Sequence, residues 1–282
     1  MVSSMEERTH EQLLQELNKL KRQQIRVKRR TTFLLSIIAM LVLITSTLAW
    51  FTLSNFANIR EINIKISTAP ELYLDIENRG TDDMSLWKKT LTNDMVNTYL
   101  GSVSAPQIND QLLDPVTTSN GISFFSEAGS PRTANNTSYL EFKVWFVATK
   151  EMWVHLSGRQ VEITDNNAGT TTTATSSVTT TETGLKADIV RAVRISFEDE
   201  GTAAIWEPNK GVSVNNQNTF DVGDNFSGDT RIFHLDTLTP KQITIRIWAE
   251  GNDPECDNDV QDANVTFEML FGGTDENNSS FE

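Results

Sequence analysis

The sequence contains very little cysteine. Cys256 is the single cysteine among 282 residues, so no intrachain disulfide can form and the fold must depend on its buried core. Disulfides are usual in proteins that pass through the eukaryotic secretory route. If the chain is exported, their absence therefore favours the surface of a Gram-positive bacterium.

Local signatures of catalysis are also missing. The chain has three histidines, His10, His155 and His234, and it contains no H-E-x-x-H, C-x-x-C, G-x-S-x-G or phosphate-loop pattern. The sequence therefore contains none of the local motifs that are typical of zinc proteases, serine hydrolases and nucleotide-binding proteins. We expect the protein not to be an enzyme and to hold no organic cofactor.

Basic residues are scarce beyond the N-terminal segment. Residues 1–32 carry 8 basic and 4 acidic side chains, whereas the remainder carries 16 basic and 34 acidic ones. An acidic body repels the phosphate backbone, so we expect no nucleic-acid partner. The basic segment suits a contact with anionic lipid, and it also serves as a plain topology signal.

One long stretch contains no charged residue. Residues 33–53 read FLLSIIAMLVLITSTLAWFTL, and as a helix they would extend about 30 Å, the thickness of the hydrocarbon core of a bilayer. This predicts a transmembrane helix through which the chain contacts a membrane. Because Lys and Arg cluster before it, the positive-inside rule places residues 1–32, a basic helical segment, in the cytoplasm and residues 54–282 outside the cell.

The same stretch can be read as an export signal. Thr47 and Ala49 place small side chains where signal peptidases read them, which suits cleavage between Ala49 and Trp50. Against cleavage, the segment before the apolar run is far longer than the charged region of a usual signal peptide. A retained membrane anchor and a cleaved export signal both remain open. The body would then lie at the cell membrane or in the extracellular matrix.

Beyond this stretch the sequence changes to the two-residue alternation of strands with one buried face. The alternation is clearest in residues 62–66, 139–148, 243–248 and 265–271. Residues 164–184 are rich in threonine and nearly devoid of apolar side chains, which predicts a flexible surface insertion. We predict an all-β ectodomain over residues 54–282, an antiparallel β-sandwich for which jelly-roll connections are one option.

An acidic loop follows one of these strands. Asp253, Glu255, Asp257 and Asp259 offer hard oxygen ligands, and such a loop outside a cell could hold Ca²⁺. Its spacing is not that of an EF-hand. A solvated acidic loop without metal is the alternative.

Two tryptophans fall on the polar side of predicted strands. Trp145 and Trp248 alternate with the core residues of their strands and so point away from the core. Aromatic side chains in such positions stack on sugars or anchor protein interfaces. Cover by a loop or helix is the alternative.

Several segments together carry a family resemblance. The apolar stretch ends in Thr47-Leu48-Ala49-Trp50-Phe51-Thr52 and leads directly into predicted strands, and YLEF at 139–142, IWEPN at 205–209 and IRIWAEGNDPEC at 245–256 follow. The chain resembles exported Gram-positive surface proteins of the TasA/camelysin type, and a large uncharacterised group with the same AWFT junction. The likeness runs over most of residues 45–271.

This resemblance implies a β-sandwich subunit of biofilm matrix fibres, matured by a dedicated signal peptidase. In such fibres an N-terminal strand of one subunit completes the sheet of the next. Carried over, the donated strand would include Ile62, Ile64 and Ile66, whose alternate side chains would fill pockets of the neighbour. The long basic N-terminal segment and the threonine-rich insertion depart from the family pattern. The metallopeptidase activity ascribed to camelysin-type proteins finds no zinc motif here.

We therefore expect a cell-surface structural or adhesive protein that associates with itself or with other surface proteins. The alternative is a carbohydrate-binding module that holds cell-wall glycan through Trp145 and Trp248.

Overall fold

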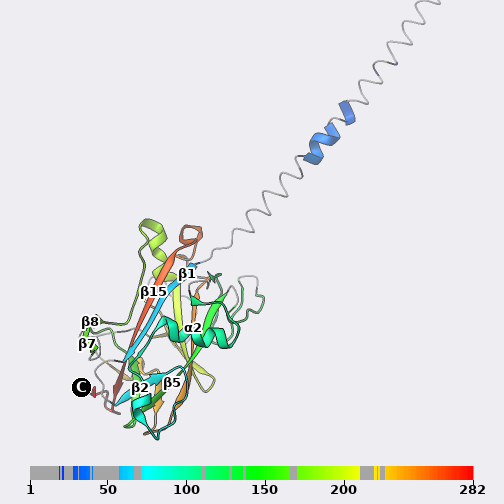
Figure 1. Ribbon diagram of the computed structural model, residues 1–282. Coiled ribbons are helices and arrows are strands. Elements are labelled where there is room, and N and C mark those ends of the chain that lie inside the picture. The colour runs from blue at the N-terminus through cyan, green and yellow to red at the C-terminus, as the bar shows by residue number, and fades with distance from the viewer. Residues whose placement is uncertain are drawn as a thin grey trace, which may run out of the picture. The chain divides into compact units, whose positions relative to one another are not determined.

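The computed structural model describes residues 19, 21, 28–30, 32–38, 40, 57–66, 71–108, 112–126, 129–135, 138–165, 170–209, 219–220, 222 and 226–281 (Figure 1). The chain divides into two compact units, Met1–Ser54 and Asn55–Glu282.

In the first unit every described residue is helical. Thr32 Oγ1 donates a hydrogen bond of 2.9 Å to the Lys28 carbonyl, and Ser36 Oγ donates one of 3.0 Å to the Thr32 carbonyl. Among the described residues, no helix combines the length and apolar character needed to cross a membrane. Most of the expected span at residues 33–53, and the Ala49–Trp50 junction, lie outside the described residues, so both remain predictions.

The second unit is built mainly from strands, which confirms the predicted β class. Within its described residues, one sheet has seven strands in the order β13-β6-β15-β1-β3, with β4 paired to β1 and β9 paired to β15. Its strands are β1 (Ala57–Ile66), β3 (Thr90–Leu91), β4 (Leu112–Leu113), β6 (Met152–Leu156), β9 (Ser177–Thr179), β13 (Phe233–Leu235) and β15 (Asn264–Thr274).

The other large sheet has six strands in the order β12-β11-β10-β14-β5-β2 among the described residues. They are β2 (Leu72–Asp75), β5 (Tyr139–Ala148), β10 (Val193–Asp199), β11 (Thr202–Trp206), β12 (Thr219–Phe220) and β14 (Lys241–Ala249). A separate hairpin joins β7 (Val161–Asp165) to β8 (Thr170–Ala174). The short helices are η1 (Met84–Leu86), α2 (Asn93–Ser102), η3 (Gly184–Asp188), α3 (Ile189–Ala192), η4 (Gly228–Thr230) and η5 (Asn258–Val260).

The two large sheets are mixed, and the expectation of a purely antiparallel arrangement is wrong. Strand β1 runs parallel to β15, and the two lie side by side in Figure 1; β11 and β12 are also parallel. Antiparallel pairs suit neighbours joined by a tight turn. Strands β1 and β15 stand near opposite ends of the chain, so no turn dictates their relative direction.

Both sheets supply side chains to one core. Phe146 of β5 lies 5.1 Å, between ring centroids, from Phe271 of β15, and Phe197 of β10 lies 5.7 Å from the same ring. The predicted alternation holds in β5, β14 and β15, whose inward residues are buried, Phe142, Ile245 and Phe267 among them. Burial of such residues stabilises the fold without a disulfide.

The threonine-rich insertion contains regular structure, which corrects the expectation of a flexible segment at residues 164–184. Residues 170–174 form β8, and β9 pairs antiparallel with β15, where Val178 is buried opposite Phe267. Threonine is β-branched and suits a strand, so low hydrophobicity did not prevent pairing. Residues 166–169 lie outside the described part of the chain.

Candidate functional site

The predicted donor residues Ile62, Ile64 and Ile66 lie in the C-terminal half of β1, which is inside a sheet of its own unit. On one side β1 pairs with β15 from Asn58 to Ile66. On the other side, among the described residues, strand pairing is confined to the two ends, Ala57 and Asn58 with β4, and Ile64 and Lys65 with β3. The strand is therefore held continuously along one edge and only at its ends along the other.

The side chains of β1 alternate between the core and the outer face. Ile59, Ile62, Ile64 and Ile66 are at most 3% exposed. A register shift between Ile59 and Glu61 lets Ile59 and Ile62 both point inward although they are three residues apart. This confirms the inward alternation predicted for residues 62–66.

Two polar contacts help to position this strand. The amide of Ile62 donates a 2.7 Å hydrogen bond to Asn93 Oδ1, which takes the place of a strand partner between β3 and β4. On the outer face, Lys65 Nζ lies 2.8 Å from Glu268 Oε1 of β15. This pair is partly exposed and contributes little to stability.

The acidic loop does not bring its four predicted calcium ligands together. Asp253 is buried, and its Oδ2 accepts a hydrogen bond of 2.5 Å from Arg194 Nη2. Asp257 caps η5 by accepting the amide of Asp259 at 2.8 Å. Glu255 lies 4.0 Å from Arg191. No three of these carboxylates converge as a metal-ligating group within the described residues.

The two candidate tryptophans have different environments. Trp248 is 0% exposed and packs against Phe124, with ring centroids 5.1 Å apart, so it cannot form an exposed binding surface. Its Nε1 donates to Glu250 Oε2 at 3.1 Å. Trp145 is partly exposed on β5, opposite Asp75 of β2. The irregular segment around residues 116–125, with no periodic signal in the sequence, covers Trp248.

Three of the four sequence segments quoted for the resemblance, 139–142, 205–209 and 245–256, are linked by polar contacts. Arg246 of β14 contacts Glu141 of β5 at 2.6 Å and Glu198 of β10 at 2.7 Å. Arg194 joins Glu207, at 2.7 Å, to Asp253. These charged groups tie neighbouring strands and the loop after β14 together, which is a structural role.

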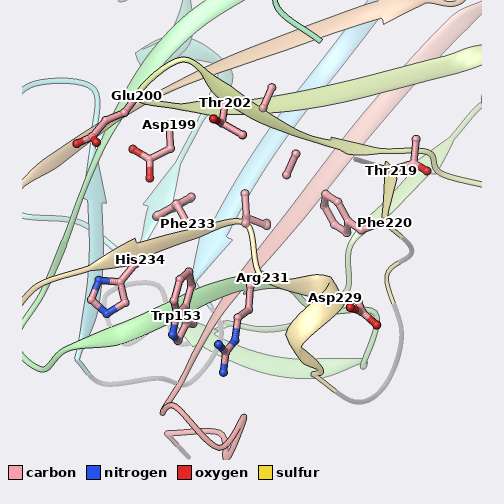
Figure 2. Close-up of a pocket in the computed structure, with 13 residues that line it drawn as sticks. Trp153, Asp199, Glu200, Thr202, Thr219, Phe220, Asp229, Arg231, Phe233 and His234 are labelled. Carbon is pink, nitrogen blue, oxygen red and sulfur yellow. The ribbon is translucent and has the colours of Figure 1, made fainter. Parts of the chain in front are cut away.

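A cleft of about 600 Å³ lies between the edge strands of the two sheets, in the size range of ligand sites (Figure 2). Figure 2 shows Trp153, Arg231 and His234 on one side of it and Asp199, Glu200 and Thr202 on the other. The apolar lining comes from Ala203, Ala204, Phe220, Ile232 and Phe233. Sequence reasoning missed this cleft because its walls come from short strands that are distant in the chain.

The wall formed by β6 and β13 is held by stacked side chains. The guanidinium of Arg231 lies 4.7 Å from the centroid of the Trp153 ring, and the His234 ring meets Trp153 edge-on at 4.8 Å. Trp153 Nε1 donates to Glu276 Oε1 at 3.2 Å, and Arg231 Nε donates to Asn278 Oδ1 at 3.1 Å. The C-terminal turn thus fixes this wall.

His155 of β6 is buried and has a structural environment. Its two ring nitrogens lie 2.9 Å from Thr230 Oγ1 and 2.8 Å from Thr274 Oγ1. Burial lowers the pKa of His155 from 6.5 to about 4. The imidazole is therefore neutral near pH 7 and bridges η4 to the end of β15.

Comparison with known proteins finds no relative. No protein family matches the sequence, no curated protein is similar to it, and no solved structure matches the fold.

Proposed function

We propose that residues 57–281 form a β-sandwich that works outside a cell as a structural or adhesive protein, and that copies associate by exchanging β1. The membrane contact or export signal at residues 33–53 would bring this body to the cell surface or matrix. The observation that carries the proposal is the position of β1 as the first described strand of its unit, paired with β15 along its length and with β3 and β4 only near its ends among the described residues.

The position of β1 suits exchange between copies. In the part of the chain that the structure describes, its other edge is paired at the two ends alone, by strands of two residues each. A terminal strand can leave its sheet without passing the chain through a loop, and an identical strand from another copy offers the same contacts. Exchange of an identical element between protomers is a low-cost route to assembly.

The energetics require that the place of β1 be filled. The four buried isoleucines of β1 each contribute about 1.5 to 3 kcal/mol of burial, or about 6 to 12 kcal/mol together. A unit that lost β1 would also leave the inner edge of β15 without hydrogen-bond partners. The vacant groove would therefore bind either its own β1 or that of a neighbour.

A disulfide lock tests the proposal. Asn63 of β1 and Glu268 of β15 are register partners on the outer face, so the double variant Asn63→Cys/Glu268→Cys, made with Cys256→Ser, can close a bond within one chain. Electron microscopy of the form starting at Trp50 should reveal fibres for the reduced variant and monomers for the oxidised one. The matched control is Asn63→Cys alone. Fibres that form equally well when the lock is closed, or monomers at every concentration for the unmodified protein, would refute strand exchange.

A further inference from the structure

The strands β6 and β13 bring one imidazole and two carboxylates together at the rim of the cleft. Glu151, His234 and Asp236 each offer a ligand atom, and these atoms all lie within 4.8 Å of one another. Glu151 precedes β6 and Asp236 follows β13. None of these three residues was singled out as a metal ligand from the sequence, because 83 positions separate Glu151 from His234.

The register of the two strands produces this cluster. His234 lies opposite Trp153, and Leu235 lies opposite Met152. Extending the antiparallel register by one residue places Asp236 opposite Glu151. His234 lies in β13 and Asp236 follows two residues later, just past its end, which is the spacing of side chains on one face of an extended strand. The cluster is thus a consequence of strand pairing.

The separation of either carboxylate from its nearer ring nitrogen suits a small divalent cation. His234 Nε2 lies 3.3 Å from Glu151 Oε1, and His234 Nδ1 lies 3.7 Å from Asp236 Oδ1. Ligand atoms about 2.1 Å from a tetrahedral zinc ion are separated by about 3.4 Å from one another. The carboxylates face different ring nitrogens, so binding through one nitrogen requires the other carboxylate to turn. Both carboxylate side chains are at least 65% exposed and are free to do so.

The imidazole is held more firmly than the carboxylates. Its ring packs edge-on against Trp153, and Trp153 is fixed in turn by Arg231 and Glu276. A ligand whose orientation is set by its neighbours loses less entropy when it binds a metal. His234 is also one of the residues that line the cleft (Figure 2).

We propose that Glu151, His234 and Asp236 bind a divalent transition metal ion of the zinc class at the rim of the cleft. One imidazole and two carboxylates form a ligand set that suits zinc and its neighbours in the first transition row. This site is separate from the acidic loop at residues 253–259 and from β1, so it stands or falls independently of the proposed strand exchange.

Isothermal titration of ZnCl₂ into the purified full-length chain at pH 7.5, in a buffer that does not chelate, tests the site. We expect one zinc ion per chain. His234→Ala should weaken binding by about tenfold or more, and so should Asp236→Asn, which keeps the packed imidazole in place. Glu200→Gln, which removes a carboxylate from the opposite side of the cleft, should leave the affinity unchanged.

Circular dichroism and unfolding curves establish that each variant is folded before titration. Absence of binding to the folded unmodified chain would overturn the site. Zinc binding that is unchanged in both His234→Ala and Asp236→Asn would overturn it as well. In either case the three residues form only an ion-pair cluster around the imidazole.

Discussion

Arg194 and Asp253 form a hydrogen-bonded ion pair of 2.5 Å in which neither side chain is exposed. Glu207 contacts the same guanidinium nitrogen at 2.7 Å and is 3% exposed. Removing one partner of a buried ion pair takes away a charge-assisted hydrogen bond in a poorly solvated place. The loop after β14 is therefore fixed to β10 by a contact that is costly to disrupt.

Substitution of Asp253 should destabilise the fold. We expect Asp253→Ala to lower the free energy of unfolding by about 1 to 3 kcal/mol, because Arg194 loses one buried charge-assisted hydrogen bond but keeps Glu207 as its partner. Asp259→Ala, in the same loop but at an exposed position, should change it by no more than about 0.5 kcal/mol. Urea unfolding followed by tryptophan fluorescence measures both. Equal effects of the two variants would contradict the structural role of Asp253.

The two candidate tryptophans should respond differently to truncation. Trp248→Ala removes a fully buried indole from its contact with Phe124 and should cost about 3 to 5 kcal/mol of stability. Trp145→Ala, at a partly exposed position, should cost clearly less. Chemical denaturation compares them, and acrylamide quenching of the folded protein supplies an independent check. A Trp248 that is as accessible to the quencher as Trp145 would contradict its burial.

Mild acid should destabilise the protein through His155. The pKa of this residue is about 4 in the folded chain and about 6.5 in the unfolded chain. Between these values the unfolded chain binds a proton that the folded chain does not, so stability falls as the pH is lowered from 6.5 toward 4. Above pH 6.5 both states are neutral at this residue and its contribution is constant. The difference between the two pKa values corresponds to a loss of about 3 kcal/mol in the free energy of unfolding once the pH falls below 4.

The variant His155→Gln separates this residue from other titrating groups. Glutamine keeps polar atoms for Thr230 and Thr274 but carries no proton in this pH range. Unfolding free energies measured at pH 7 and pH 4.5 should therefore differ less for the variant than for the unmodified chain. An identical pH dependence of the two proteins would show that His155 does not titrate in this way.

Alanine substitutions at two glycines with positive φ distinguish the cost of a steric clash from the cost of backbone strain. At Gly121 (φ +69°) an added Cβ would lie 2.9 Å from Ser196 Cβ and 3.0 Å from Ile205 Cγ1. At Gly129 (φ +79°) nothing lies within 4 Å of that position. Gly129→Ala should cost about 1 kcal/mol from strain alone, and Gly121→Ala should cost about 1 to 3 kcal/mol more. Thermal unfolding measures both, and equal costs would contradict the close packing at Gly121.

Much of the fold could be predicted from local sequence pattern. The alternation in β5, β14 and β15 gave their inward residues correctly, because a strand with one buried face carries that information within itself. The parallel direction of β1 and β15 could not be predicted, since their pairing joins residues about 200 positions apart. Strands β8 and β9 were not predicted because their own residues are only weakly hydrophobic. Their regular structure comes from backbone pairing with β7 and β15.

The candidate site was harder to predict than the fold. Sequence reasoning placed Trp248 on the outer face of β14, which is correct for the strand itself, but gave no sign that Phe124 would cover it. Asp253 is of a residue type that often binds metal ions, but its carboxylate accepts a hydrogen bond from Arg194, 59 residues earlier in the chain. The cluster around His234 depends on the register of β6 with β13, which no local pattern encodes.

Strand exchange between copies is tested most directly by mixing two single-cysteine chains. One carries Asn63→Cys and the other Glu268→Cys, both with Cys256→Ser, so a disulfide between these positions can form only if β1 of one chain lies beside β15 of another. We predict that the assembled mixture, once oxidised, yields a covalent heterodimer, in which mass spectrometry finds the two introduced cysteines joined to each other. Assemblies that form normally but give no such bond, while the double variant closes it within one chain, would contradict the account.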